Sequence, residues 1–501
     1  MREYEINLNP NKLVKYLKKP ANEFTRHDII RFIEENGIEM VNFRYPGEDG
    51  KLKTLNFVIT SRDYLESILS TGERVDGSSL FSYVEAASSD LYVIPRFSSA
   101  FVNPFSEVPS VDILCSYYTG EGKPLESAPE YILKKAHDEF KKATGLTFKA
   151  MGELEYYVIS KKDELYPAQD QKGYHNSQPF AKWENIRKEA MNMLAQTGCK
   201  IKYGHSEVGN FIKGDEYFEQ HEIEFQPVDA EDAADQLIKA KWILRMLGQK
   251  YGVIISFAPK ITVGNAGSGL HIHMQLEKNG VNIMTDENSI SDPARKMIVG
   301  LLEKARSLTA FGNTVPLSYL RLVPHQEAPT NICWGDSNRS ALVRVPLGWI
   351  SKTNMIMNAN PYERYDVPYI PGKQTIEIRT PDGSADIYHL LAGIIMAAQY
   401  GLEMENALQR SDELYIDVNI FKVDNKKLSG TLDQLPVSCS ESADALEKDR
   451  SFYEKNNIFP KGTIDRFINH LRSYNDDKLS EQLYGNDKEL MKLVDKYIHH
   501  M

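Results

Sequence analysis

Met151-Gly-Glu-Leu-Glu-Tyr-Tyr-Val-Ile159 is the stretch of this sequence around which the fold and the site can be worked out. Valine, isoleucine and tyrosine favour a β-strand, in which successive side chains point to opposite faces. Glu153 and Glu155 therefore share one face, and Leu154 and Tyr156 share the other. Two like charges this close repel each other, so a folded protein keeps them either in solvent or around a cation. The stretch alone leaves both possibilities open.

Three later stretches repeat this alternation. In each, two polar residues stand two positions apart and so share one strand face: Glu222 and Glu224, His271 and His273, and Glu377 and Arg379. Four such strands predict a sheet with one face lined by carboxylates, two imidazoles and an arginine. Mostly oxygen ligands with one or two nitrogens suit Mg²⁺ or Mn²⁺ rather than Zn²⁺. Because burying so many like charges unpaired is costly, the set favours a metal site over a solvated face.

Arginines gather elsewhere in the chain, at Arg321, Arg339 and Arg344. The guanidinium fork binds carboxylate and phosphate groups, and divalent cations beside arginines are what phosphoryl transfer requires. A surface network of ion pairs is the alternative interpretation. The sequence has no GxxxxGK[ST] stretch, which excludes a P-loop enzyme.

Length and composition indicate an ordinary globular chain. Its 501 residues are 42% hydrophobic and 26% charged, which allows a sizeable core and favours two domains. A net charge of −11 without a Lys/Arg cluster argues against nucleic acid as a partner. We find neither a long apolar run nor a signal segment, so we expect no membrane span and a cytoplasmic protein. The 4 cysteines are widely separated and lack a CxxC pair, so they predict neither a disulfide framework nor a zinc site.

The order of predicted elements suggests a small domain before a larger one. Residues 1–25 are polar and are expected to be an extension, and Thr25 can cap the helix that follows. Two strands then form a hairpin, and Val75–Ser79 is expected to be an exposed loop because it is rich in small polar residues. A helix beginning near Glu130 leads into the Glu153 strand. We therefore predict a small N-terminal domain over residues 26–118 and a larger domain over residues 119–501.

Taken in order, these motifs resemble class I glutamine synthetase over residues 26–475. An ordered set of this kind is specific, although no single motif is. The matching segments are Asp76–Ser79, Gly152–Glu155, Gly173-Tyr174, His205–Glu207, Gln220–Glu222, Gly267–His273, Arg321–Pro324, Glu327–Pro329, Asn338–Ala341 and Ile376–Asp382.

The resemblance implies an α+β fold, with a small N-terminal β-grasp domain and a large C-terminal catalytic domain built on a curved antiparallel sheet flanked by helices. It also implies a homo-oligomer, a dodecamer of two stacked hexameric rings with active sites between neighbouring subunits. The implied reaction joins L-glutamate to ammonia through γ-glutamyl phosphate, with ATP as co-substrate.

The resemblance also implies ligands for two divalent ions and for the nucleotide. The metal nearer glutamate would be held by Glu155, Glu207 and Glu222, and the metal on the ATP phosphates by Glu153, His271 and Glu377. Phosphate contacts would come from Arg339 and Arg344. The nucleotide would lie beside His273, Phe225 and Lys373.

The remaining implied roles concern the two other substrates. Glutamate would contact Gly267, Arg321 and Arg379. Asp76 of the neighbouring subunit would deprotonate ammonium, in an anionic pocket completed by Ser79, Tyr174, Glu207 and Glu327. Glu327 would also shield the acyl phosphate from water.

The sequence departs from the family pattern at several places. Ala266 stands where the family has asparagine, and Gln275 stands where it has serine. Val208–Glu219 and Leu347–Gly372 are longer than usual, and residues 476–501 do not resemble the usual ending. The segment around Tyr415 keeps only fragments of the family's adenylylation motif, so we do not predict that modification.

These departures leave open a relative that joins glutamate to another amine. A catalytically inactive relative is a further alternative, but it predicts eroded ligands, and all of the implied metal ligands are present.

Overall fold

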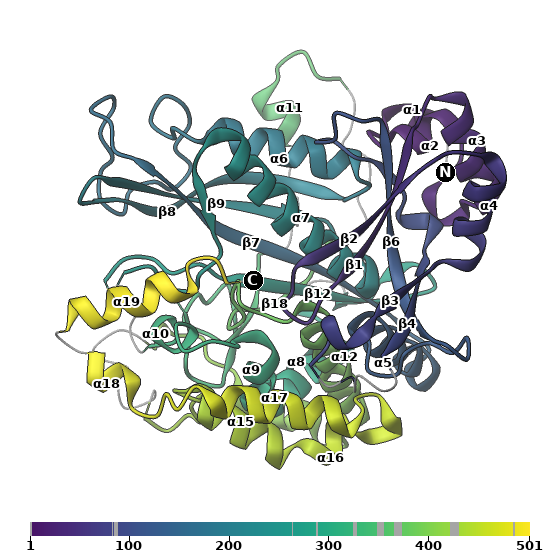
Figure 1. Ribbon diagram of the computed structural model, residues 1–501. Helices are drawn as coiled ribbons and strands as arrows, with labels where there is room; N and C mark the ends of the chain where they lie inside the picture. Colours follow the sequence, from purple (N-terminus) through teal and green to yellow (C-terminus); the bar gives the residue numbers. More distant parts are fainter. Residues whose placement is uncertain are drawn as a thin grey trace.

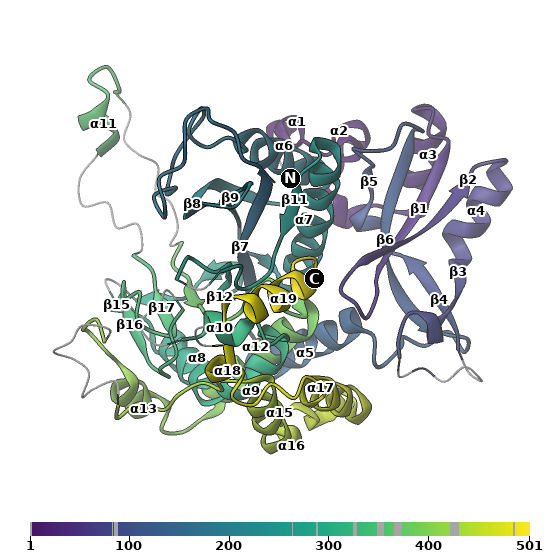
Figure 2. The same cartoon turned by 60° about the vertical axis from the view of Figure 1, so that its left-hand side comes forward.

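The computed structural model describes residues 3–82, 84, 89–262, 264–286, 289–323, 328–347, 355–364, 373–420, 430–483 and 486–500. Two large sheets and many helices make up this part of the chain, with the smaller sheet formed by the N-terminal residues (Figure 1). The smaller sheet lies to one side of the larger one (Figure 2). This arrangement confirms the predicted α+β fold.

The N-terminal sheet has the strand order β2-β1-β6-β4-β3, and β5 pairs with β6. Its hairpin β1/β2 is antiparallel, whereas β1 and β6 run parallel. Thr25 and Asp28 cap each other's backbone at the start of the first long helix, as a capping box does. The elements are α3 (Arg26–Glu35), β1 (Met40–Pro46), β2 (Leu52–Val58), α4 (Arg62–Thr71), β3 (Glu73–Asp76), β4 (Asp90–Pro95), β5 (Phe101–Val102) and β6 (Ser110–Thr119).

Residues 1–25 are more than an extension, which corrects the expectation from sequence. The described part forms the short helices α1 (Glu3–Leu8) and α2 (Lys12–Leu17). Leu13, Val14 and Leu17 are buried in the same apolar core as the N-terminal sheet. The polar composition of this segment gave no indication of α2, because a helix this short is stabilised only by packing against the rest of the fold.

The large sheet has the strand order β16-β17-β18-β12-β7-β9-β8. The pairs along it are antiparallel except β16/β17, which is parallel. Short strands β10, β11 and β13 add to β7 and β12, and β14 (Thr285–Asp286) pairs with β15 (Ser289–Ile290) separately. The bounds are β7 (Thr147–Lys161), β8 (Ile201–Lys213), β9 (Glu216–Phe225), β10 (Val228–Asp229), β11 (Ile254–Ser256), β12 (Leu270–Lys278), β13 (Val281–Asn282), β16 (Trp334–Asp336), β17 (Val343–Val345) and β18 (Ile376–Ile378).

One face of this sheet is covered by helices. Leu154, Ile223, Ile272 and Ile378 are completely buried there, each on a strand that carries one of the predicted polar pairs. The predicted alternation therefore holds, because the apolar set packs inward and leaves the polar set on the opposite face. The helices that contact these strands are α5 (Pro129–Thr144), α6 (Glu184–Gln196), α7 (Ala230–Tyr251) and α8 (Asp292–Glu303). Behind them, α12 (Ile387–Glu403) packs against α5 and α8, and α9 (Ala305–Gly312) packs against α12; α10 (Ser318–Arg321) is a short helix that follows α9.

The long Val208–Glu219 stretch forms the end of the β8/β9 hairpin. The register shifts between Ser206 and Asn210, which marks a bulge over residues 207–209, with Glu207 as its first residue. The other long stretch is only partly described, as residue 347 and residues 355–364, which contain α11 (Met355–Ala359).

Gly209 lies inside that bulge and has no room for a side chain. A Cβ there would lie 2.0 Å from the Tyr157 hydroxyl and 2.4 Å from Oε1 of Gln220. We expect Gly209→Ala to destabilise the fold by about 2 kcal/mol through overpacking, measured as a lower urea midpoint. Gly120→Ala is the control, because nothing lies within 4 Å of its added Cβ. Equal midpoints for the two variants would contradict the prediction.

The C-terminal helices pack below the large sheet (Figure 1). The last helix returns to the β8/β9 hairpin, where Leu490, Val494 and Tyr497 share an apolar cluster with Phe211 and Phe218. The remaining helices are α13 (Ala407–Leu414), α15 (Cys439–Lys448), α16 (Arg450–Tyr453), α17 (Lys461–Ser473), α18 (Leu479–Leu483) and α19 (Asp487–Tyr497). In the described part of the chain, every helix is too short or too polar to cross a membrane.

Candidate active site

The polar face of the large sheet lines a cavity of about 1070 Å³. Strand register brings its residues together in pairs. Glu153 lies opposite His271 on β12 and Glu224 on β9, and Glu155 lies opposite Glu222. Cross-strand neighbours on one face lie about 5 Å apart, so residues far apart in sequence form one continuous polar surface.

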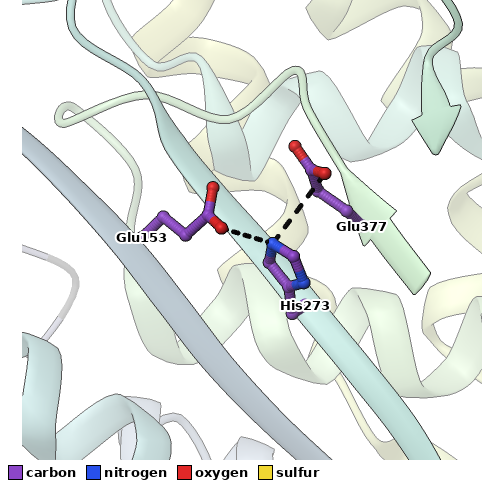
Figure 3. A group of neighbouring side chains, drawn as sticks. All are labelled: Glu153, His273 and Glu377. Atoms are coloured by element: carbon purple, nitrogen blue, oxygen red, sulfur yellow. Dashed lines mark ion pairs between the residues drawn. The ribbon is translucent and has the colours of Figure 1, made fainter. Parts of the chain in front are cut away.

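The centre of this surface is a histidine–carboxylate group (Figure 3). His273 Nε2 lies 2.7 Å from Glu153 Oε1 and 3.9 Å from Glu377 Oε2. His271 Nδ1 lies 3.0 Å from Glu153 Oε2 and 3.4 Å from Glu377 Oε1. Donor atoms of Glu153, His273 and Glu377 all lie within 4.8 Å of one another, as do those of Glu153, Glu222 and His271. One small ion can therefore contact three of these side chains at once.

A third group forms toward the β8 edge of the sheet. It joins His205, Glu222 and Glu224, with His205 Nε2 3.0 Å from Glu222 Oε2. Lys202 Nζ also lies 2.6 Å from Glu224 Oε2. The family resemblance implied no ligand role for His205 or Glu224. Each stands two positions from a predicted ligand, His205 from Glu207 and Glu224 from Glu222, and strand alternation puts such residues on the same face. This spacing is the feature of the sequence by which their place in the site could have been predicted.

Glu155 and Glu207, the predicted companions of Glu222, also line the cavity. Glu155 Oε2 accepts hydrogen bonds from the Gly269 backbone N–H at 2.7 Å and from Gln220 Nε2 at 3.1 Å. Glu207 Oε2 accepts from the N–H of Val208 at 2.8 Å. Among the described residues, neither carboxylate belongs to a group of three close donors.

The charges in the cavity shift the pKa values of the carboxyl groups in opposite directions. Burial and then the charges of Glu153 and Glu155 raise the pKa of Glu222 well above its usual value. Burial would also raise the pKa of Glu153, but His273 and His271 outweigh it and hold that pKa well below its usual value. The Glu222 side of the cavity thus carries excess negative charge.

Metal binding should therefore release a proton from Glu222. Its carboxyl group keeps a proton to higher pH than a free glutamate does, and a cation requires the ionised form. We expect Mn²⁺ affinity to fall as the pH is lowered. Calorimetry in buffers of different ionisation enthalpy measures the protons released, and Glu222→Gln should release fewer. Proton release that is identical in the wild type and the variant would contradict this assignment.

The basic residues lie toward the other side of the sheet. Arg344 and Arg379 each contact Glu377 at 3.0 Å. The guanidinium of Arg321 is buried and donates to the Thr380 carbonyl at 2.8 Å. The exposed Arg339 and Lys373 also line the cavity. Most acidic residues of the cavity lie on β7, β8 and β9, and most of its basic residues lie near β17 and β18, where Glu377 is the acidic exception. The cavity is therefore polarised.

Two further predicted residues, Gly267 and Tyr174, line the same cavity. Gly267 lines the cavity beside Arg321, and a Cβ added to it would lie 3.1 Å from Cγ of that arginine. Tyr174 also lines the cavity, with 53% of its surface exposed and its ring stacked on His175 at 4.2 Å.

Phe225 lies elsewhere. Its side chain is completely buried in the helix-covered core, so it does not line the cavity, which corrects any expectation of a side-chain contact with nucleotide. Asp76 and Ser79 lie on the N-terminal part of the chain and do not line this cavity either. Glu327 lies outside the described residues.

The donor set fits a hard divalent cation. Carboxylate oxygens dominate the three close groups, each of which includes one imidazole nitrogen, and no cysteine contributes to any of them. Oxygen-rich sites of this kind suit Mg²⁺ and Mn²⁺ better than Zn²⁺. The excess negative charge around Glu222 is what such ions would neutralise.

A family model described as "Glutamine synthetase, catalytic domain" matches residues 126–483, and one described as "Glutamine synthetase, beta-Grasp domain" matches residues 37–120. The glutamine synthetase of Clostridium saccharobutylicum is 30% identical over 435 residues, covering 85% of this chain and 90% of the relative. That of Pyrococcus horikoshii is 31% identical over 429 residues, covering 84% and 87%.

Solved structures resemble the fold. A cryo-EM structure of Plasmodium falciparum glutamine synthetase has a TM-score of 0.73 and 21% identity, covering 92% of this chain and 98% of that one. A structure titled "Apo GmaS without ligand" has a TM-score of 0.70 and 20% identity, covering 90% and 96%. The two family models and the curated relatives span both sheets and the residues of the polar cavity, and so this chain belongs to the glutamine synthetase family of ATP-dependent ligases.

Proposed function

We propose that this enzyme condenses L-glutamate with ammonia to form L-glutamine, by way of γ-glutamyl phosphate and with release of ADP and phosphate. The observation that supports this best is the polarised cavity, in which a carboxylate–imidazole cluster and a set of arginines face one space. Such a site can hold cationic and anionic reactants side by side.

The chemistry explains why both kinds of residue are needed. Ammonia cannot displace an oxygen from a carboxylate until that oxygen becomes part of a leaving group, and transfer of the ATP γ-phosphoryl group to glutamate achieves this. Arg339 and Arg344 would neutralise charge on the transferring group, because a guanidinium binds phosphate oxygens in a planar, two-pronged way. The acidic clusters of Glu153 and Glu222 would hold divalent ions, which supply positive charge to the phosphate oxygens when bound.

The glutamate substrate would lie against Gly267, Arg321 and Arg379. Arg321 is well suited to orient it, because the Thr380 and Arg379 carbonyls already fix its guanidinium, at 2.8 and 3.2 Å. A pre-fixed side chain loses little entropy when it binds a carboxylate.

Ammonium would bind where Tyr174 and Glu207 line the same cavity. Asp76 and Ser79 would be supplied by a neighbouring subunit, in an assembly of two hexameric rings. This fits their position on the N-terminal part of the chain, away from the cavity of their own subunit. Glu327 would complete the pocket and shield the acyl phosphate.

Phosphate release from ATP with glutamate and Mg²⁺ or Mn²⁺ tests the proposal, comparing ammonium with a panel of amines. We expect release with ammonium and glutamine as the product. A strong preference for a larger amine would replace this function with that of a γ-glutamyl-amine ligase. No release with any acceptor would indicate an inactive relative.

A further inference from the structure

Gln171 makes a contact that joins two separate parts of the cavity wall. It lies in the connection between β7 and α6, and its side chain reaches Ala266, which lies in the cavity wall four residues before the start of β12. Gln171 Oε1 accepts a hydrogen bond from the Ala266 backbone N–H at 2.8 Å. Because alanine has no polar side chain, Ala266 can form hydrogen bonds only through its backbone N–H and carbonyl groups.

Both backbone groups of Ala266 are held. Gln171 accepts from its N–H, and the Tyr157 hydroxyl donates to its carbonyl at 2.8 Å. The next residue, Gly267, packs against the buried side chain of Arg321, and its carbonyl accepts from Gln220 Nε2 at 2.9 Å. Fixing Ala266 therefore fixes the Gly267 and Arg321 side of the cavity.

The other end of the contact belongs to the segment that carries Tyr174. Three backbone N–H groups tie this segment to the bulged end of β8: Gln171 to Asn210 at 2.9 Å, Gly173 to Val208 at 3.3 Å and His175 to Ser206 at 2.9 Å. A Cβ at Gly173 would lie 2.5 Å from the Glu207 carbonyl oxygen, so this segment approaches β8 very closely. Gln171 thus extends from a firmly held segment.

Both the backbone conformation of Gln171 and the burial of its side-chain amide nitrogen are unfavourable for the stability of the fold. Its φ of 52° lies in the left-handed region, which is unfavourable for a residue with a Cβ. Its Nε2 is buried and donates no hydrogen bond to any described residue. Glycine would adopt this backbone conformation with less strain. The glutamine side chain is therefore the reason for a non-glycine residue at this position.

We propose that Gln171 is a positioning residue that ties the Gly267 and Arg321 side of the pocket to the Tyr174 and Glu207 side. The two sides are those expected to bind the amino acid and the amine, so this inference rests on the proposed function. Without the contact, each side would keep its own residues but lose its fixed spacing to the other. Affinity for both substrates should then fall together, whereas nucleotide binding should not.

The test uses the full-length enzyme with Gln171→Met, which keeps the length of the side chain but removes the acceptor, and Gln171→Gly, which also relieves the backbone. We expect KM for glutamate and for the amine acceptor to rise about tenfold in both variants, as the loss of one hydrogen bond predicts. KM for ATP should stay unchanged. Gln171→Gly should match or exceed the wild-type melting temperature, a result that a merely structural role for the side chain does not give.

Gln169→Met is the matched control, because Gln169 is an exposed glutamine in the same segment and does not line the cavity. It should leave all three KM values unchanged. Unchanged KM values for glutamate and amine in both Gln171 variants would overturn the inference, as would a fall in kcat and melting temperature with constant KM. The acceptor preference of the wild-type enzyme tests the proposed function separately. The KM comparison between the wild type and the Gln171 variants then uses whichever acceptor the wild type prefers.

Discussion

Replacing Glu153 by glutamine is expected to lower phosphate release from ATP by about 10³-fold, because charge stabilisation of this kind is the largest catalytic term in such sites. Glu153 belongs to two of the three close donor groups and contacts both histidines of the cluster. The variant keeps the shape of the side chain and removes its charge. His273 would then lose the carboxylate that lies 2.7 Å from its Nε2.

Two measurements separate this effect from misfolding. Calorimetric titration with Mn²⁺ should show weaker or fewer sites in Glu153→Gln, and the melting temperature of the metal-free protein reports on the fold. Glu216→Gln is the control, since Glu216 is an exposed carboxylate at the start of β9, outside the cavity. If Glu153→Gln turned over at the wild-type rate, the assignment of Glu153 as a metal ligand would be wrong.

Replacing Asp76 by asparagine is expected to lower amide formation by about 10³-fold while metal binding stays intact, since a positioned proton acceptor contributes a factor of this order. Hydrogen bonds from Ser79 and Ser78, each at 2.7 Å, help lower the pKa of the exposed Asp76 to about 2, so the carboxylate is anionic at neutral pH. Burial against a neighbouring subunit would raise that pKa and bring it nearer the range that a base requires.

Asp90→Asn is the matched control, because Asp90 lies opposite Asp76 on β4 and pairs with Arg74 at the surface. Normal glutamine synthesis by Asp76→Asn would contradict the assignment. Co-expression of Asp76→Asn and Glu153→Gln chains gives a sharper test of shared sites. Random assembly should restore about a quarter of the sites, because one site would then draw the two residues from different chains. No recovery would place both residues in the site of a single chain.

Strand alternation accounts for much of what could be predicted about the site. A period of two assigned Glu153, Glu222, His271 and Glu377 to one face, and the structure brings all of them into one cavity. The same rule assigned Phe225 to the opposite face with Ile223, where both are buried. The family resemblance suggested a nucleotide contact at Phe225, and the alternation already argued against one through its side chain.

Other features could not be read from the sequence. His205 joins Glu222 because of the register of β8 on β9, and that register shifts at two irregularities which local sequence does not specify. The burial of Leu13 and Leu17 depends on a core made mostly by later residues. The contact between Gln171 and Ala266 joins two segments 95 residues apart.

The sequence by itself determined which side chains share a face of each strand and, through the ordered motifs, the family. The tertiary structure decided which of these faces meet, how closely the carboxylates approach one another, and which residues hold the cavity walls together. The physical reason is the distance along the chain between the residues that interact. Strand alternation follows from backbone geometry within a few residues, whereas strand register and side-chain contacts depend on packing between segments that meet only in the folded chain.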